Sequence, residues 1–102
     1  MLQISKFEMH SGADRNQFGN AAFNLCKAAR ATPGVVDAKY YWVNANCIGF
    51  IIDADPGAWG PGAVSTAETA KASFALADVS SQTSNEHWMG AREGTENYNL
   101  AQ

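Results

Sequence analysis

Aromatic side chains are concentrated at one point of the chain, where Tyr40, Tyr41 and Trp42 stand in succession. A tyrosine hydroxyl or an indole N–H can orient a flat apolar molecule whose body packs against the rings. The segment is therefore a candidate pocket wall, with Tyr40 as a candidate catalytic hydrogen-bond donor and with Tyr41 and Trp42 as candidate binding residues. Strand side chains alternate, so Tyr41 faces away from Tyr40 and Trp42, and either face can line the pocket. The competing interpretation is that all three belong to a core or a subunit interface.

Histidine is the side chain best suited to move a proton near neutral pH, and the chain has two. His10 is two residues from Glu8, so both lie on one face of a strand, and an imidazole beside a carboxylate suits a general base. His10 is accordingly the candidate catalytic base, whereas the alternative is an exposed pair at the end of a strand. His87 either completes the pocket from a late strand or lies on the surface.

Three more apolar residues complete the predicted substrate-binding set, namely Phe50, Trp59 and Phe74. Trp59 lies in the Pro/Gly-rich segment 55–62, where it would act as a lid between glycine hinges, plug one end of a barrel or meet a partner chain. Asp37 and Lys39 share the face of Tyr41. They would pair with each other or across a two-fold axis if buried, or remain solvated at an edge.

Several classes of site are not indicated. Cys26, Cys47 and the two histidines do not occur at the spacings of zinc ligands. The glycines match neither the dinucleotide-binding nor the phosphate-binding loop pattern. We therefore expect no metal and no cofactor.

Charge and hydropathy exclude other partners. The seven Lys and Arg residues are scattered and the net charge is −3, so nucleic-acid binding is not expected. No apolar run approaches the roughly 18 residues of a membrane span, and no membrane association is expected. The N-terminal residues do not resemble a signal peptide, and two cysteines do not make a disulfide framework, which together predict a cytoplasmic location.

The first half of the chain reads as strand, helix and hairpin. A strand is expected over 2–9 and a helix over 14–31, with Ser11 or Asp14 as its N-cap and with one apolar face formed by Phe18, Ala22, Leu25 and Ala29. Pro33 and Gly34 end that helix. Strands are expected over 35–43 and 47–54, joined by a tight turn at 44–46.

The second half is less regular. Ser65 and Glu68 form a capping box that predicts a helix over 66–79, with Ala67, Ala70, Phe74 and Ala77 as a thin apolar face. Residues 80–85 are predicted as a polar loop, 86–92 as a short fourth strand and 93–102 as a polar tail. One domain, residues 1–92, is expected.

The order β-α-β-β-α-β predicts a ferredoxin-like α+β plait, in which a four-stranded antiparallel sheet carries both helices on one face. The hairpin has aromatic residues on both of its faces, so the second sheet face also requires cover. A two-fold homodimer in which two such faces pack together provides that cover.

At this point residues 2–80 resemble the dimeric α/β-barrel superfamily, which includes the antibiotic-biosynthesis monooxygenase-like proteins. The resemblance is carried by Leu2-Gln3-Ile4-Ser5-Lys6-Phe7-Glu8-Met9, by the helix end at Ala31-Thr32-Pro33-Gly34-Val35-Val36, and by the hairpin that follows. It implies a dimeric α/β barrel with a pocket between each sheet and its own helices, or within the barrel. The family includes cofactor-independent oxygenases of aromatic polyketides and haem-degrading enzymes. The haem-degrading members use a histidine of the second helix and an asparagine of the first strand, and this sequence has neither.

Two functions follow as hypotheses. In the first, the chain is a cofactor-independent monooxygenase-like protein, and a small aromatic or apolar substrate activates dioxygen through its own carbanion. In the second, it is a non-catalytic dimer that binds a small ligand or another protein. Haem binding is a third and weaker alternative.

Overall fold

The computed structural model describes residues 1–60, 63 and 66–88, and these residues form two helices and four strands. Along the chain the elements are β1 (Leu2–Met9), α1 (Arg15–Arg30), β2 (Val35–Asn44), β3 (Cys47–Ala54), α2 (Ala67–Val79) and β4 (Ser80–Trp88). The predicted tail at 93–102 lies outside the described residues. Neither helix is long and apolar enough among the described residues to cross a membrane.

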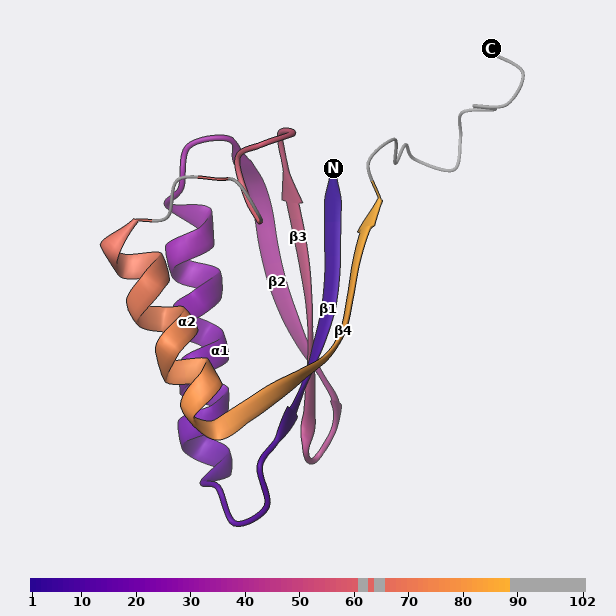
Figure 1. The fold of residues 1–102 in the computed structure, drawn as a ribbon, viewed down its shortest axis with the longest axis vertical. Coiled ribbons are helices and arrows are strands. Elements are labelled where there is room, and N and C mark those ends of the chain that lie inside the picture. The colour runs from indigo at the N-terminus through magenta and orange to yellow at the C-terminus, as the bar shows by residue number, and fades with distance from the viewer. Residues whose placement is uncertain (61–62, 64–65, 89–102) are drawn as a thin grey trace, which may run out of the picture.

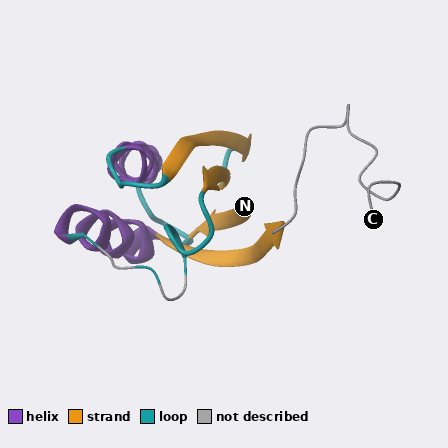
Figure 2. Cartoon of the chain, turned by 90° about the horizontal axis from the view of Figure 1, so that it is seen from above, coloured by secondary structure: helices purple, strands orange, loops and turns teal. Residues whose placement is uncertain are grey.

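The strands form one antiparallel sheet in the order β2-β3-β1-β4. Both helices lie on the same side of this sheet, as the two views of the ribbon show (Figure 1 and Figure 2). The predicted ferredoxin-like α+β plait is therefore confirmed.

Helix α1 begins and ends where its sequence predicts. The side chain of Asp14 accepts a hydrogen bond from the backbone N–H of Asn16 at 2.9 Å and caps the first turn. The predicted apolar face is buried against the sheet, together with Ala21 and Cys26. At the far end Gly34 adopts a φ of +88°, which turns the chain from the helix into β2.

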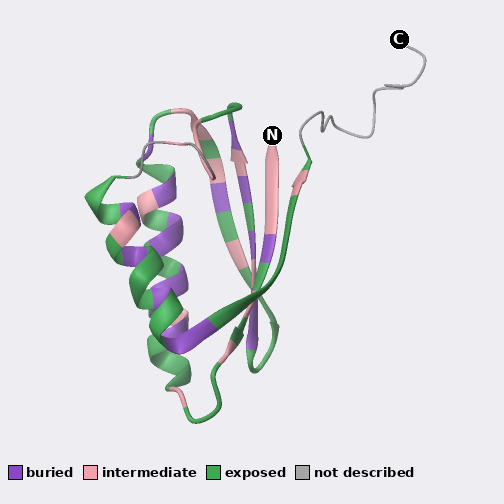
Figure 3. Ribbon diagram, in the orientation of Figure 1, coloured by how far each residue is buried: buried purple, intermediate pink, exposed green. Residues whose placement is uncertain are grey.

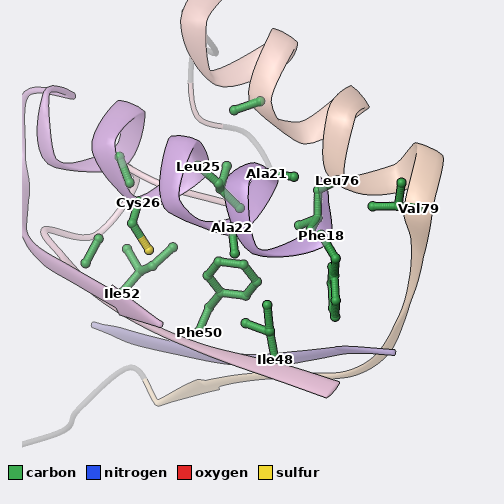
Figure 4. Close-up of a cluster of buried hydrophobic side chains, with 13 residues drawn as sticks. Phe18, Ala21, Ala22, Leu25, Cys26, Ile48, Phe50, Ile52, Leu76 and Val79 are labelled. Atoms are coloured by element: carbon green, nitrogen blue, oxygen red, sulfur yellow. The ribbon is translucent and has the colours of Figure 1, made fainter. Parts of the chain in front are cut away.

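The core lies between α1 and the central strand β3. Phe18, Leu25, Ile48, Phe50 and Leu76 meet there from three elements (Figure 4). Ile48, Phe50 and Ile52 alternate along β3 and all face α1, whereas Gly49 and Ile51 face the other side of the sheet. Figure 3 shows this burial as alternating bands along β3.

Helix α2 differs from the prediction in its start and in its buried face. Its N-cap is Thr66 rather than Ser65, and the Thr66 hydroxyl accepts a hydrogen bond from the N–H of Thr69 at 3.1 Å. The predicted face containing Phe74 was wrong, because the helix buries Thr69, Ala72, Leu76 and Val79. The predicted and the observed residues both recur at helical spacing, so the sequence could not distinguish the two faces. In the structure α2 packs on α1 through the face that includes Leu76.

The fourth strand also differs from the prediction. Residues 80–85, predicted as a loop, belong to β4, which pairs with β1 from Met9↔Ser80 to Leu2↔Trp88 with a register shift between Lys6 and Phe7. Most of β4 is exposed and polar, and it is the edge strand of the sheet beside β1. A strand without an apolar face gives no alternation signal, so the sequence pattern missed it.

The sheet face opposite the helices carries an apolar patch that is uncovered in the single chain. Val43, Ile51 and Trp88 are 52%, 40% and 49% exposed there. The strand registers place Leu2 and Ile4 on the same face, since Ile4 pairs with Ile51 and Leu2 with Trp88. We call these five residues the open-face patch.

Candidate functional site

A pocket of about 340 Å³ lies between α2 and the β1–β4 half of the sheet. It exists because the two helices cover the sheet unequally. Helix α1 packs on β2 and the core, whereas α2 packs mainly on α1 and approaches the sheet near its C-terminal end, where the chain enters β4. The pocket occupies the space between the other part of α2 and the strands.

The floor of the pocket is built by strand side chains that point toward the helices. Ser5 pairs with Phe50 on one side and with Asn85 on the other, so these three side chains lie next to one another across the sheet. Phe7 meets Phe50 edge-on, with ring centroids 5.5 Å apart. One end of the floor is therefore aromatic and the β4 side is polar.

Helices and the β3–α2 connection close the remaining sides. Leu25 and Thr32 contribute from α1 and its end, Thr69 and Ser73 from α2, and Ala58, Trp59, Gly60 and Ala63 from the connection. The connection is held in place because the N–H of Asp55 donates to the Gly34 carbonyl at 2.7 Å and the N–H of Ala58 donates to the Asp55 carbonyl at 3.0 Å. Trp59 is partly buried and packs against the core.

The polar side chains of the pocket are neutral. Gln3 donates from Nε2 to Oδ1 of Asn85 at 3.0 Å, which links the two strands across the pocket floor. Thr32 donates to the Ala28 carbonyl at 2.9 Å. None of the described residues that line the pocket has an ionisable side chain, so their chemistry is hydrogen bonding rather than proton transfer.

The sequence-predicted site residues are dispersed. Phe50 and Trp59 line this pocket. The ring of Tyr40 lies beside that of Phe50, with the two centroids 6.4 Å apart. Tyr40 does not line the pocket, and together with Tyr41 it lines a different groove. Trp42 packs edge-on against Phe18 at 5.6 Å, away from the pocket.

Two candidates are not part of the lining. Phe74 is 73% exposed on α2. His10 is exposed just beyond β1, where its Nε2 hydrogen-bonds with the Ser81 hydroxyl at 2.8 Å. Asp37 and Lys39 form an ion pair of 3.4 Å at the exposed edge of β2, which is the solvated alternative considered for them.

The polar floor residues Gln3, Ser5, Gln82 and Asn85 were not anticipated from the sequence. The sequence of β1 did contain a signal for them. Gln3 and Ser5 lie on the same strand face as Phe7, which the helices cover. Polar residues on a covered face indicate a cavity. In β4 there was no such signal, since nearly every residue is polar.

His87 lies at the edge of the pocket. It pairs with Gln3 across the strands, and a Cβ on Gly60 would come within 3.4 Å of its Nε2. That nitrogen is buried and has no hydrogen-bond partner among the described residues. His87 is thus the imidazole beside the pocket, next to the lining residue Gly60.

Both cysteines are free and buried. Burial raises the pKa of the Cys26 thiol to about 11, an effect that nearby Arg30 partly opposes. The described residues contain no group of three or more His, Cys, Asp or Glu side chains that could hold a metal ion.

Comparison with known proteins gives one kind of match. No family model matches the sequence, and no curated protein does. Among solved structures, SnoaB, a cofactor-independent oxygenase from Streptomyces nogalater, matches over 93% of this chain and 96% of its own, with a TM-score of 0.75 and 14% sequence identity. This chain has the SnoaB fold. A point mutant of SnoaB matches with a TM-score of 0.70 and 16% identity over the same shares of the two chains. The resemblance expected from the sequence is confirmed at the level of the fold.

Proposed function

We propose that this chain is a cofactor-independent, monooxygenase-like protein that acts on a small aromatic molecule in the pocket between α2 and the sheet. The observation that carries the proposal is the composition of that pocket. Phe7, Phe50 and Trp59 provide flat apolar contacts, and neutral amides and hydroxyls line the same pocket beside them. A volume of about 340 Å³ is within the range of small-molecule sites. The likeness in fold to an oxygenase is the second support.

The neutral lining restricts the chemistry. With no ionisable side chain among the described lining residues, the substrate itself must be acidic enough to lose a proton to solvent water, as an activated ring methylene or a phenol is. Amide and hydroxyl donors such as those of Asn85 and Ser73 would stabilise the resulting oxyanion. Oxidation of a methylene then follows R–CH₂–R′ + O₂ → R–CO–R′ + H₂O. All four electrons come from the substrate.

Aromatic residues outside the pocket have a supporting part in this proposal. Tyr40 lies behind Phe50 and would fix the orientation of that ring. The position of His10 gives no support to a role as base, because its ring is exposed and hydrogen-bonded to Ser81.

The test is oxygen uptake with a panel of tricyclic anthrones and quinols. We expect turnover by the wild-type protein without added cofactor, and we expect Asn85→Leu to lower kcat/KM by about a hundredfold because it removes an oxyanion donor. Trp59→Ala should raise KM. Phe74→Ala removes an exposed aromatic side chain outside the pocket and is the matched control. Uptake that stays at the uncatalysed rate for the whole panel would count against the proposal.

The second candidate function is non-catalytic binding of a small ligand, and the neutral lining favours it. Calorimetric binding of the same compounds without oxygen uptake, lost in Trp59→Ala, would support this function instead.

We further propose that the protein is a homodimer formed through the open-face patch, and that it is cytoplasmic. Support for the dimer is the exposure of Val43, Ile51 and Trp88 on a sheet face that no described element covers.

A further inference from the structure

A second groove, separate from the pocket, runs between α1 and the free edge of β2 and has a volume of about 510 Å³. Three rings and three cations line it: Phe23, Tyr40 and Tyr41, with Lys27, Arg30 and Lys39. Phe23, Lys27 and Arg30 recur at intervals of four and three residues, so they present one face of α1 to the groove.

The groove follows the edge of the sheet rather than either face. Tyr40 pairs with Phe50 and therefore points toward the helices, whereas Lys39 and Tyr41 pair with Ile51 and Gly49 on the opposite face. Side chains from opposite faces of a strand can line one groove only along the edge of that strand.

The edge of β2 retains its capacity for hydrogen bonding. β3 is its neighbour on one side, and no described strand pairs with the other side. The register shifts of the β2–β3 ladder lie near its ends, between Val35 and Asp37 and between Trp42 and Asn44, so the middle of the strand is regular. Residues 35–44 contain neither proline nor glycine. Such an edge presents a row of N–H and C=O groups to an incoming strand.

The charge of the groove is positive although the net charge of the chain is −3. Asp37 is the carboxylate beside it, and it is shared by Arg30 at 3.6 Å and Lys39 at 3.4 Å. The pKa of Asp37 is lowered, chiefly by the hydrogen bond from the Ala38 N–H and further by Lys39 and Arg30. One carboxylate cannot neutralise three cations, and Lys27 forms no ion pair with any described residue.

We propose that the β2 edge binds an extended acidic polypeptide segment, which adds to the sheet as a fifth strand. Its backbone would pair with the middle of β2. Alternate side chains of the segment would pack on Tyr40 and Phe23 on the helix side and on Tyr41 on the other. Its carboxylates would meet Lys27, Arg30 and Lys39, and this charge complementarity selects an acidic segment over a basic one.

The probe is a fluorescein-labelled heptapeptide in which glutamate and valine alternate in pairs, so that carboxylates project from both faces of the extended peptide. Binding is measured by fluorescence anisotropy at low salt. We expect saturable binding that Lys39→Glu weakens by about tenfold or more, since reversal of the charge places like charges together. Lys71→Glu on α2 makes the same change of charge away from the groove and should leave binding unchanged. Both lysines are exposed, so both variants should fold, and circular dichroism verifies this.

Two further peptides test the mode of binding. A lysine–valine peptide should not bind, and a glutamate–valine peptide with alternate backbone amides N-methylated should bind about tenfold more weakly or worse, because it cannot complete the strand ladder. Amide hydrogen exchange should slow in β2 when the peptide is bound. The proposal is overturned if the wild-type protein fails to bind at millimolar peptide, if the N-methylated peptide binds as well as the parent, or if protection appears elsewhere and not in β2.

Discussion

Two constraints act on Gly34, the glycine that follows α1. Its φ of +88° lies in the region that residues with a side chain rarely adopt. A Cβ at this position would also come within 2.6 Å of the Cβ of Ala58, which lines the pocket. The carbonyl of Gly34 accepts the hydrogen bond that anchors Asp55. A single residue therefore positions one wall of the candidate site.

We expect Gly34→Ala to lower the free energy of unfolding by about 2–5 kcal/mol, through backbone strain and overpacking together. Gly12→Ala is the control, because Gly12 has a similar φ of +81° but open space around its Cβ position. It should cost about 1–2 kcal/mol from strain alone. Urea denaturation followed by circular dichroism measures both. Equal losses in the two variants would show that contact with Ala58 contributes nothing.

Trp42 shows why residue type alone did not locate the site. Its ring packs edge-on against Phe18, and a Cβ on Gly19 would lie 3.2 Å from it, so the indole sits close against the backbone of α1. The side chain remains 43% exposed. An aromatic residue suits a pocket, a core and a surface equally well, and its position in the sheet determines which one it joins.

At the scale of elements, α2 determines whether there is a pocket. It packs against α1 through Thr69, Ala72, Leu76 and Val79, and most of its length is held away from β1 and β4. Thr69 and Ser73 then face the space that remains. Two faces of this helix have the same periodicity, and only the position of α1 distinguishes them.

Leu76 is 1% exposed, so we expect Leu76→Ala to lower the free energy of unfolding by about 2–5 kcal/mol through the cavity it leaves. Phe74→Ala removes a larger side chain but one that is 73% exposed, and it should change stability by no more than about 0.5 kcal/mol. Chemical denaturation of the two variants side by side is the measurement. A larger loss in Phe74→Ala would mean that the helix buries the opposite face.

At the scale of the whole molecule, the sheet has one covered face and one uncovered face. The open-face patch combines aliphatic and aromatic residues from all four strands, with Ile4 and Ile51 paired in it. An exposed apolar surface of this kind on a folded domain is typical of a protein interface. The dimer proposed above buries it.

Ile51→Lys should shift a dimer of 10.9 kDa chains toward monomer, weakening association by about a hundredfold or more, since a two-fold axis places two unpaired ammonium groups in the interface. Phe74→Lys introduces the same charge on the exposed side of α2 and should leave the dimer intact. Sedimentation equilibrium gives the masses. At roughly 100 µM chain, even a dimer with a micromolar Kd is mostly assembled. A wild-type protein that is monomeric at that concentration would contradict the proposed interface.

The sequence by itself determined the elements whose signals are local. The apolar face of α1, its end at Thr32-Pro33-Gly34 and the hairpin on either side of residues 44–46 were predicted with nearly their observed bounds. These features depend on side-chain period, φ preference and turn chemistry within a few residues. Their order along the chain was enough to predict the ferredoxin-like plait.

The tertiary structure alone decided the site. Phe50 and Trp59 were the predicted residues that reached the pocket, whereas Gln3, Ser5, Gln82 and Asn85 came from strand positions that carry no catalytic motif. The periodicity of a sequence predicts which side chains of one element share a face. It does not predict the distance between that face and the element packed opposite it. Here the separation of α2 from β1 and β4 leaves the cavity, and that distance follows from how α2 packs on α1.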